Sequence, residues 1–182
     1  VDGQSYPLPE PFLVVATQNP IEQHGTYPLP EAQLDRFAVK VSLGYPPAEV
    51  EVDILEKQAL GHPLVDLSSV VNLDEVKEAR KIVRQVKVER SVGEYMVSIA
   101  RATREHPSLR LGVSPRGSLI LYRLAQARAC LDDRDYVTPD DVKSVAVPVL
   151  AHRLVLEAKA RYSGVSEEEL VREILEELKP PL

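Results

Sequence analysis

From Ala48 onward, apolar side chains recur at every third or fourth position in one segment after another. This is the spacing of the buried face of an α-helix, and it constrains the fold of the chain more than any other feature. Val52, Leu55 and Ala59 form such a stripe in the first segment. The pattern predicts helices over residues 48–59, 73–87, 91–106 and 114–131, and two more that begin near residues 138 and 166.

Helix-capping residues stand where the later segments begin. Ser114 is followed by Pro115, and serine at the N-cap with proline at the first helical position favours a helix start. Thr138-Pro-Asp-Asp141 and Ser166-Glu-Glu-Glu169 have the spacing of a capping box. Residues 46–182 are therefore predicted to form an all-α domain.

Residues 1–45 differ from this helical part. Phe12–Ala16 is a continuous apolar run, which is typical of a strand buried on both faces of a parallel sheet. Phe37–Leu43 alternates enough to form a second strand, and the prolines between the two runs break regular structure. We therefore predict an α/β portion over residues 1–45, followed by the helical domain, in a predominantly helical chain.

Asn19 follows the first predicted strand directly, in the sequence Thr17-Gln-Asn-Pro20. In parallel sheets the ligand crevice lies beyond the carboxyl ends of the strands. An uncharged amide in that position can orient a water or contact a phosphate oxygen. Asn-Pro is also a common turn starter, so the pattern by itself leaves a purely structural role open.

Charge and composition argue against several classes of protein. The formal net charge is −6, whereas a chain that grips phosphate backbones needs a basic face. No apolar stretch approaches the roughly 20 residues that cross a bilayer. The four histidines lack metal-ligand spacing, so no zinc site is expected. The single cysteine, Cys130, is expected to be a small core residue, and it fits a reducing, cytoplasmic location.

Two motifs carry a specific resemblance to a known family. Ala16-Thr-Gln-Asn-Pro-Ile-Glu22 and Tyr27-Pro-Leu-Pro-Glu-Ala-Gln-Leu-Asp-Arg-Phe37 resemble the MoxR family of AAA+ ATPases closely. The agreement is nearly continuous from Val1 to about Tyr45 and looser through the helical remainder. The resemblance implies that residues 1–45 belong to the α/β ATPase core and that the helical domain is the AAA+ lid.

The family resemblance also implies roles for three residues. Asn19 corresponds to sensor 1, Arg36 to the arginine finger, and Arg116, in Ser114-Pro-Arg-Gly-Ser118, to sensor 2. It implies that the complete protein uses ATP and Mg²⁺ and forms a homo-oligomeric ring, which in this family has six subunits. It further implies chaperone-like remodelling or maturation of protein clients, some of which carry von Willebrand factor A-type domains.

The Walker motifs are missing from the chain. A P-loop requires Gly-x-x-x-x-Gly-Lys-Ser/Thr, and the nearest approach, Gly112–Ser118, has a serine in place of the lysine. The nearest approach to a Walker B strand, Val70–Glu75, is interrupted by the polar Asn72. We therefore expect these 182 residues to be the C-terminal portion of a longer ATPase and to hydrolyse no ATP by themselves.

Arg36 and Arg116 each have a simpler explanation from the residues alone. Arg36 adjoins Asp35, so a surface ion pair is the alternative to a finger, although a planar and permanently charged guanidinium suits a transferring phosphoryl group. Arg116 stands in the first turn of a predicted helix, where the helix dipole disfavours a cation. A phosphate held there would explain it, and a solvated arginine is the alternative. Whether Arg116 acts on its own or a neighbouring subunit stays open.

The remaining charged candidates carry weaker signals. Glu22, Glu31 and Asp35 are expected to be solvated loop carboxylates, with a subunit interface as the alternative. His152 and Arg153 lie near a predicted helix end, where cations are favourable.

Two other functions stay open as alternatives to the ATPase. One is a nucleic-acid-associated module, in which the closely spaced helices after residues 113 and 137 would mimic a helix-turn-helix. The other is a non-catalytic assembly piece. The acidic balance disfavours the first of these.

Overall fold

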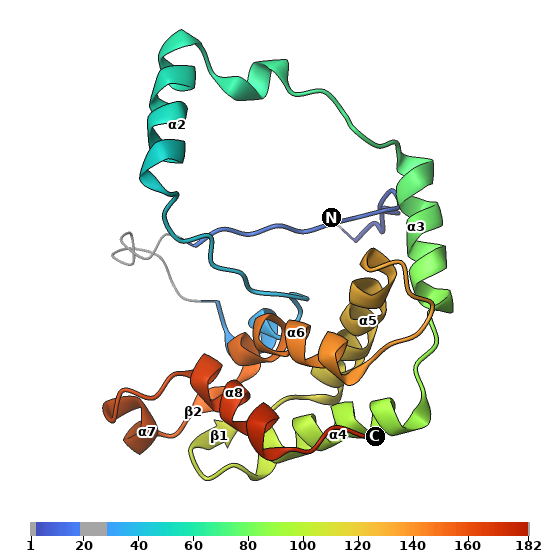
Figure 1. Ribbon diagram of the computed structural model, residues 1–182, viewed down its shortest axis with the longest axis vertical. Helices are drawn as coiled ribbons and strands as arrows, with labels where there is room; N and C mark the ends of the chain where they lie inside the picture. Colours follow the sequence, from blue (N-terminus) through green and yellow to red (C-terminus); the bar gives the residue numbers. More distant parts are fainter. Residues whose placement is uncertain (1–2, 19–28, 182) are drawn as a thin grey trace.

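The computed structural model describes residues 3–18 and 29–181. All six helices expected from the sequence are present, with bounds that differ by few residues, as α2, α3, α4, α5, α6 and α8 (Figure 1). The elements follow one another as α1 (Glu31–Leu34), α2 (Ala48–Leu60), η1 (Pro63–Asp66), α3 (Leu73–Gln85), α4 (Arg90–Glu105), β1 (Leu109–Leu111), α5 (Pro115–Leu131), α6 (Pro139–Leu150), η2 (Ala151–Arg153), β2 (Val155–Leu156), α7 (Ala158–Tyr162) and α8 (Glu167–Glu177).

Helices α4, α5, α6 and α8 form one bundle around the hydrophobic core (Figure 1). The stripe predicted on α4 is buried, with Ile99 fully inaccessible at its centre. Full burial of an aliphatic side chain of this kind contributes about 1.5–3 kcal/mol, so the bundle supplies most of the driving force for folding. Cys130 is half-buried and packs against this core, as predicted.

The predicted caps fix where the helices of the bundle begin. The Ser114 hydroxyl accepts a hydrogen bond from the Gly117 N–H at 3.4 Å, with Pro115 in the first turn. Thr138 and Ser166 form complete capping boxes with acidic residues three positions later. Each cap of this kind stabilises a helix by about 1 kcal/mol.

Several short elements were not predicted. Strands β1 and β2 pair antiparallel, with Leu109 opposite Leu156, and tie the end of α4 to the segment that follows η2. The helix α1 has only four residues and begins after Pro30. Elements this short carry too few residues for a periodic pattern, so the sequence offered no signal for them.

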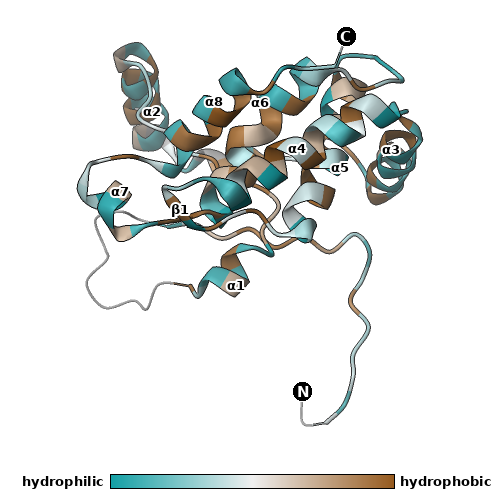
Figure 2. Ribbon diagram, turned by 90° about the horizontal axis from the view of Figure 1, so that it is seen from below, coloured by the Kyte–Doolittle hydropathy of each residue, from teal (hydrophilic) through white to brown (hydrophobic). Residues whose placement is uncertain are grey.

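The two predicted strands are wrong for this structure. Residues 12–18 and 37–43 are not strands, and Leu13 is 82% exposed. Figure 2 shows the N-terminal segment running away from the helical bundle. A strand requires a neighbouring strand to bond with, and neither segment has one among the described residues.

Helices α2 and α3 form as predicted, but their apolar stripes are largely uncovered. Leu55 on α2 is 66% exposed, and Ile82 on α3 is 49% exposed. In Figure 1 the two helices stand apart from each other, joined by a long connection that contains η1. Only α3 contacts the bundle substantially, through α5, and Val86 at its C-cap is buried. The helical period therefore predicted the helices correctly but not what would cover them.

Arg134 and Asp141 form the closest ion pair of the bundle. The two guanidinium nitrogens of Arg134 lie 2.7 Å and 2.5 Å from the carboxylate oxygens of Asp141, which is 3% exposed. Burial alone would raise the pKa of Asp141, but the hydrogen bonds from Arg134 and Thr138 outweigh it and lower this pKa to about 2. The carboxylate closes the capping box at the start of α6 as well.

We expect Asp141→Asn to destabilise the protein by about 2 kcal/mol at pH 7. Because the pKa of Asp141 is lowered in the folded state, its contribution is complete above the ordinary carboxyl pKa and is lost as the pH falls through about 2. The gap in unfolding free energy between the native protein and Asp141→Asn should therefore narrow between about pH 4 and pH 2. Chemical denaturation across this range measures it, with Glu78→Gln as the control, since the exposed Glu78–Lys81 pair should contribute under 1 kcal/mol. A constant gap would contradict the assignment.

Candidate functional site

The turn that presents Arg36 begins directly after α1. The Arg36 N–H donates to the Gln33 carbonyl at 3.1 Å, and the Phe37 N–H donates to the Leu34 carbonyl at 3.1 Å. The Arg36 side chain is exposed, and it makes no hydrogen bond or ion pair with any described residue. The alternative of a surface pair with Asp35 is therefore not what the structure shows.

Asp35 is engaged on the side of the turn that faces the bundle. Its carboxylate accepts a hydrogen bond from the Ser114 hydroxyl, at 3.2 Å and 3.1 Å to its two oxygens. The Arg153 Nε lies 3.2 Å from the same carboxylate, within ion-pair distance although its N–H is not directed at the oxygen. The expectation that Asp35 is a solvated loop carboxylate is wrong, because it links α1 to the bundle.

Arg153 is the most buried cation among the described residues, with a side chain only 1% exposed. Its guanidinium donates to the Asp35 carbonyl at 3.3 Å, the Ala38 carbonyl at 3.4 Å, and also the Phe37 carbonyl. It donates to the Val149 carbonyl on α6 as well. The prediction that Arg153 is merely a favourable cation near a helix end missed this role, although its place in the apolar run Val149–Leu156 was a usable signal.

The electrostatics of this group are consistent with its burial. Burial lowers the pKa of the Arg153 guanidinium, the charge of Asp35 raises it, and the nearby charge of Arg116 lowers it. Arginine stays protonated under all of these influences. The His152 Nε2 lies 2.7 Å from the Arg153 Nη1 and 3.2 Å from the Phe37 carbonyl oxygen. Burial and the charge of Arg153 lower the pKa of His152, which favours the neutral ring.

Arg116 lies in the first turn of α5, two residues after the Ser114 cap. Its side chain is exposed and close enough to Arg153 to influence its pKa. The Ser114 hydroxyl that caps this helix is already bonded to Asp35. An anion at this position would meet the Arg116 guanidinium, whereas the Gly117 N–H of the helix start is already bonded to Ser114.

The loop before Ser114 is fixed by α4. The Thr103 hydroxyl accepts from the Val113 N–H at 3.0 Å, and the Arg104 Nε donates to the Val113 carbonyl at 2.7 Å. At Gly112 an added Cβ would lie 2.6 Å from the backbone nitrogen of Arg104, so only glycine permits this approach. The start of α5 is consequently held on a rigid support.

The structure thus connects the two elements that carry Arg36 and Arg116, two of the three predicted site residues. Arg36 adjoins Asp35, and Arg116 lies two residues beyond Ser114, so a single hydrogen-bonded pair connects their elements. Asn19 and Glu22 lie outside the described residues. Glu31 pairs with Arg110 at 3.0 Å, with both side chains exposed, as expected for a solvated carboxylate.

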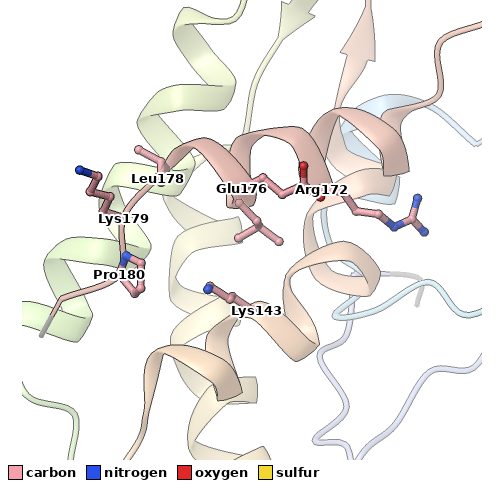
Figure 3. A pocket seen from close by; sticks show the side chains of 7 residues that line it. Lys143, Arg172, Glu176, Leu178, Lys179 and Pro180 are labelled. Carbon is pink, nitrogen blue, oxygen red and sulfur yellow. The ribbon is translucent and has the colours of Figure 1, made fainter.

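Other surface features carry no comparable site. A groove beside α8 is lined by Lys143, Arg172 and Lys179, but Figure 3 shows the last two side chains extending in opposite directions, so the cations do not converge. No group of three potential metal ligands is found within the described residues. Among the helices of that same part, none has the length and apolar character to cross a membrane.

Comparison with known proteins defines the class. The AAA lid domain family matches residues 101–174, and the family described as ATPase family associated with various cellular activities (AAA) matches residues 1–39. The chain superposes over its full length on a protein from Cytophaga hutchinsonii ATCC 33406, assigned as an ATPase, with a TM-score of 0.91 and 35% identity, covering 58% of that chain. The fold and the motifs are those of AAA+ ATPases.

Within this class, the relatives of the chain include proteins of the MoxR family, which confirms the resemblance seen in its motifs. It is 47% identical to YeaC of Bacillus subtilis (strain 168), aligned along its full length and 57% of YeaC. It is 36% identical to Chaperone MoxR1 of Mycobacterium tuberculosis, again along its full length and 50% of MoxR1. The chain spans about half the length of the curated relatives that it matches.

A substitution at Gly117 tests how closely helix α5 packs against Arg153. A Cβ there would lie 2.6 Å from Val113 Cγ1 and 3.1 Å from Arg153 Cδ, whereas a Cβ at Gly93 on α4 would meet nothing within 4 Å. We expect Gly117→Ala to destabilise the protein by about 1–3 kcal/mol through overpacking. Gly93→Ala should instead stabilise it by up to about 1 kcal/mol, because alanine is the better helix former.

Chemical denaturation of the two variants measures this difference directly. Gly93→Ala is the matched control, since both positions are helical and gain the same side chain. If Gly117→Ala proved as stable as Gly93→Ala, the close packing of α5 on Arg153 would be contradicted.

Proposed function

We propose that the complete protein is a MoxR-type ATPase in which Arg36 is the arginine finger and Arg116 is sensor 2. One observation carries the proposal. The Arg36 guanidinium is exposed and has no partner among the described residues, whereas the backbone on both sides of it is hydrogen-bonded to the buried Arg153. A surface arginine without a function does not require a fixed backbone, so these hydrogen bonds favour a functional role for Arg36.

Arg36 suits charge stabilisation on a neighbouring subunit. A guanidinium presents planar, bidentate donors and keeps its charge, which fits the oxygens of a transferring phosphoryl group. Such a finger is worth on the order of 10³–10⁵ in rate in GTPase systems. A finger on the outside of one subunit serves the nucleotide of the next, so the contact is head-to-tail and closes into a ring, for which we propose six subunits.

The family implies ATP and Mg²⁺ as ligands. The residues of this chain could supply only some of the groups that contact them. Arg116 offers an exposed guanidinium at a helix start, which suits a phosphate oxygen. Asn19, as sensor 1, would orient the attacking water. The groups that cradle the triphosphate and hold Mg²⁺ are not among these 182 residues.

The client is proposed by analogy with the relatives. MoxR1 of Mycobacterium tuberculosis is named a chaperone, and we propose chaperone-like remodelling or maturation of protein clients, including proteins with von Willebrand factor A-type domains. We place this activity in the cytoplasm, in keeping with the single cysteine.

Arg36→Ala in the complete protein should bind ATP normally and hydrolyse it at least about 10³-fold more slowly. Mixing it with a variant whose own Walker A lysine is replaced should restore part of the activity. Some mixed interfaces would then pair an intact pocket with an intact finger, whereas neither parent ring contains such an interface. Steady-state ATPase assays on the separate and mixed proteins measure this.

Arg110→Ala is the matched control for Arg36→Ala. Arg110 is an exposed arginine beside the same segment, paired only with Glu31 among the described residues, and its loss should leave turnover unchanged. No recovery on mixing, with mixed assembly confirmed by mass spectrometry, would mean that Arg36 acts within its own chain.

A further inference from the structure

We propose that Arg153 is a positioning residue for ATP hydrolysis, which holds the Arg36 turn rigidly against the lid through Asp35 and the neighbouring backbone. This inference rests on the proposed function of Arg36 as a finger. It assigns to the lid of each subunit the task of aiming the finger that the same subunit offers to its neighbour.

The donors of Arg153 bond the chain on both sides of Arg36. One terminal nitrogen donates to the Asp35 and Phe37 carbonyls, immediately before and after the finger. The other donates to the Ala38 carbonyl at 3.4 Å. A single planar group therefore fixes the backbone from which the Arg36 side chain projects, while leaving that side chain free.

Arg153 is itself anchored on the lid side. Its Nη1 donates to the Val149 carbonyl at the end of α6, and its side chain is packed against Gly117 of α5. With 1% exposure it has no room for another rotamer. The turn is thus bonded to a group that cannot move independently of the bundle.

Asp35 makes a second link to the same helix that carries Arg116. Its carboxylate faces Arg153 and accepts from the Ser114 hydroxyl, which caps α5. The Lys40 N–H adds a further bond, to the Pro148 carbonyl at 2.9 Å. A rotation of the lid would therefore carry Arg36 with it, so a change at Arg116 is transmitted to the finger.

Lysine cannot reproduce this arrangement. Its three donors radiate from one point, whereas the guanidinium spreads five donors in a plane to reach carbonyls on either side of the turn. Arg153→Lys keeps the charge next to Asp35 but loses the simultaneous contacts. It is therefore a test of positioning rather than of charge.

The experiment is a double-mutant cycle in the complete protein, with Arg153→Lys, Arg36→Ala and the double variant. Arg153→Lys should lower kcat by about 10–100-fold, the cost of a misplacement of about 1 Å, and change the KM for ATP by less than about 3-fold. In the Arg36→Ala background it should cause no further loss, because there is no finger left to aim. Arg134→Lys, at the half-buried pair with Asp141, is the control and should lower Tm without lowering kcat.

Each result has a separate meaning. An undiminished kcat in Arg153→Lys, or an equal further loss in the double variant, would overturn the positioning role. An undiminished kcat in Arg36→Ala would overturn the finger instead, and with it the proposed function, whatever Arg153 does.

A milder pair of variants covers the case in which Arg153→Lys does not fold. Ser114→Ala removes the link to Asp35 and one helix cap, and Ser166→Ala removes an equivalent cap on α8 that has no connection to Arg36. Both should cost about 1 kcal/mol in stability. Only Ser114→Ala should lower kcat, and only when Arg36 is present; an equal effect of the two variants on kcat would overturn the proposal.

Discussion

The contact between Arg153 and the Asp35 turn is the interaction on which the candidate site depends. Removing a guanidinium from water costs several kcal/mol, which is repaid only when charge and hydrogen bonds are both supplied. Here the charge comes from the Asp35 carboxylate and the hydrogen bonds from the carbonyls of residues 35, 37, 38 and 149. Loss of the turn would take most of these partners away from Arg153, which favours the docked position.

Among the described residues, two arginine–aspartate pairs have one buried member each, and the two pairs have different consequences. Arg134 and Asp141 are seven residues apart, and their pair closes a helix cap within one connection. Asp35 and Arg153 are joined across almost the whole chain, with 116–118 residues separating the bonded groups. The first pair stabilises local structure that would form in any case, whereas the second decides where a distant segment sits. This difference makes Arg134 an informative control for Arg153.

The sequence predicted what is local and missed what is distant. The six long helices and the Ser114, Thr138 and Ser166 caps depend on neighbouring residues, so period and capping chemistry sufficed for them. The apolar run of residues 12–16 predicted a strand, but a strand depends on partners that lie elsewhere. Asp35 and Arg153 each resembled an ordinary charged residue near a turn or helix end, because nothing in their own surroundings in the sequence records the other. The family motifs supplied Arg36 and Arg116 as candidates, while their connection through Asp35 and Ser114 required the fold.

The connection also bears on how a phosphate would meet this site. A helix start normally attracts an anion through its unpaired N–H groups and its dipole. At α5 the Ser114 hydroxyl already bonds one of those N–H groups and the Asp35 carboxylate as well. The negative charge that the helix start favours is therefore supplied from within the chain, and Arg153 balances it. Arg36 and Arg116 remain exposed, each within two residues of a member of the Asp35–Ser114 hydrogen bond. On the proposed function, a nucleotide bound to one of them would act on elements that this pair joins to the other.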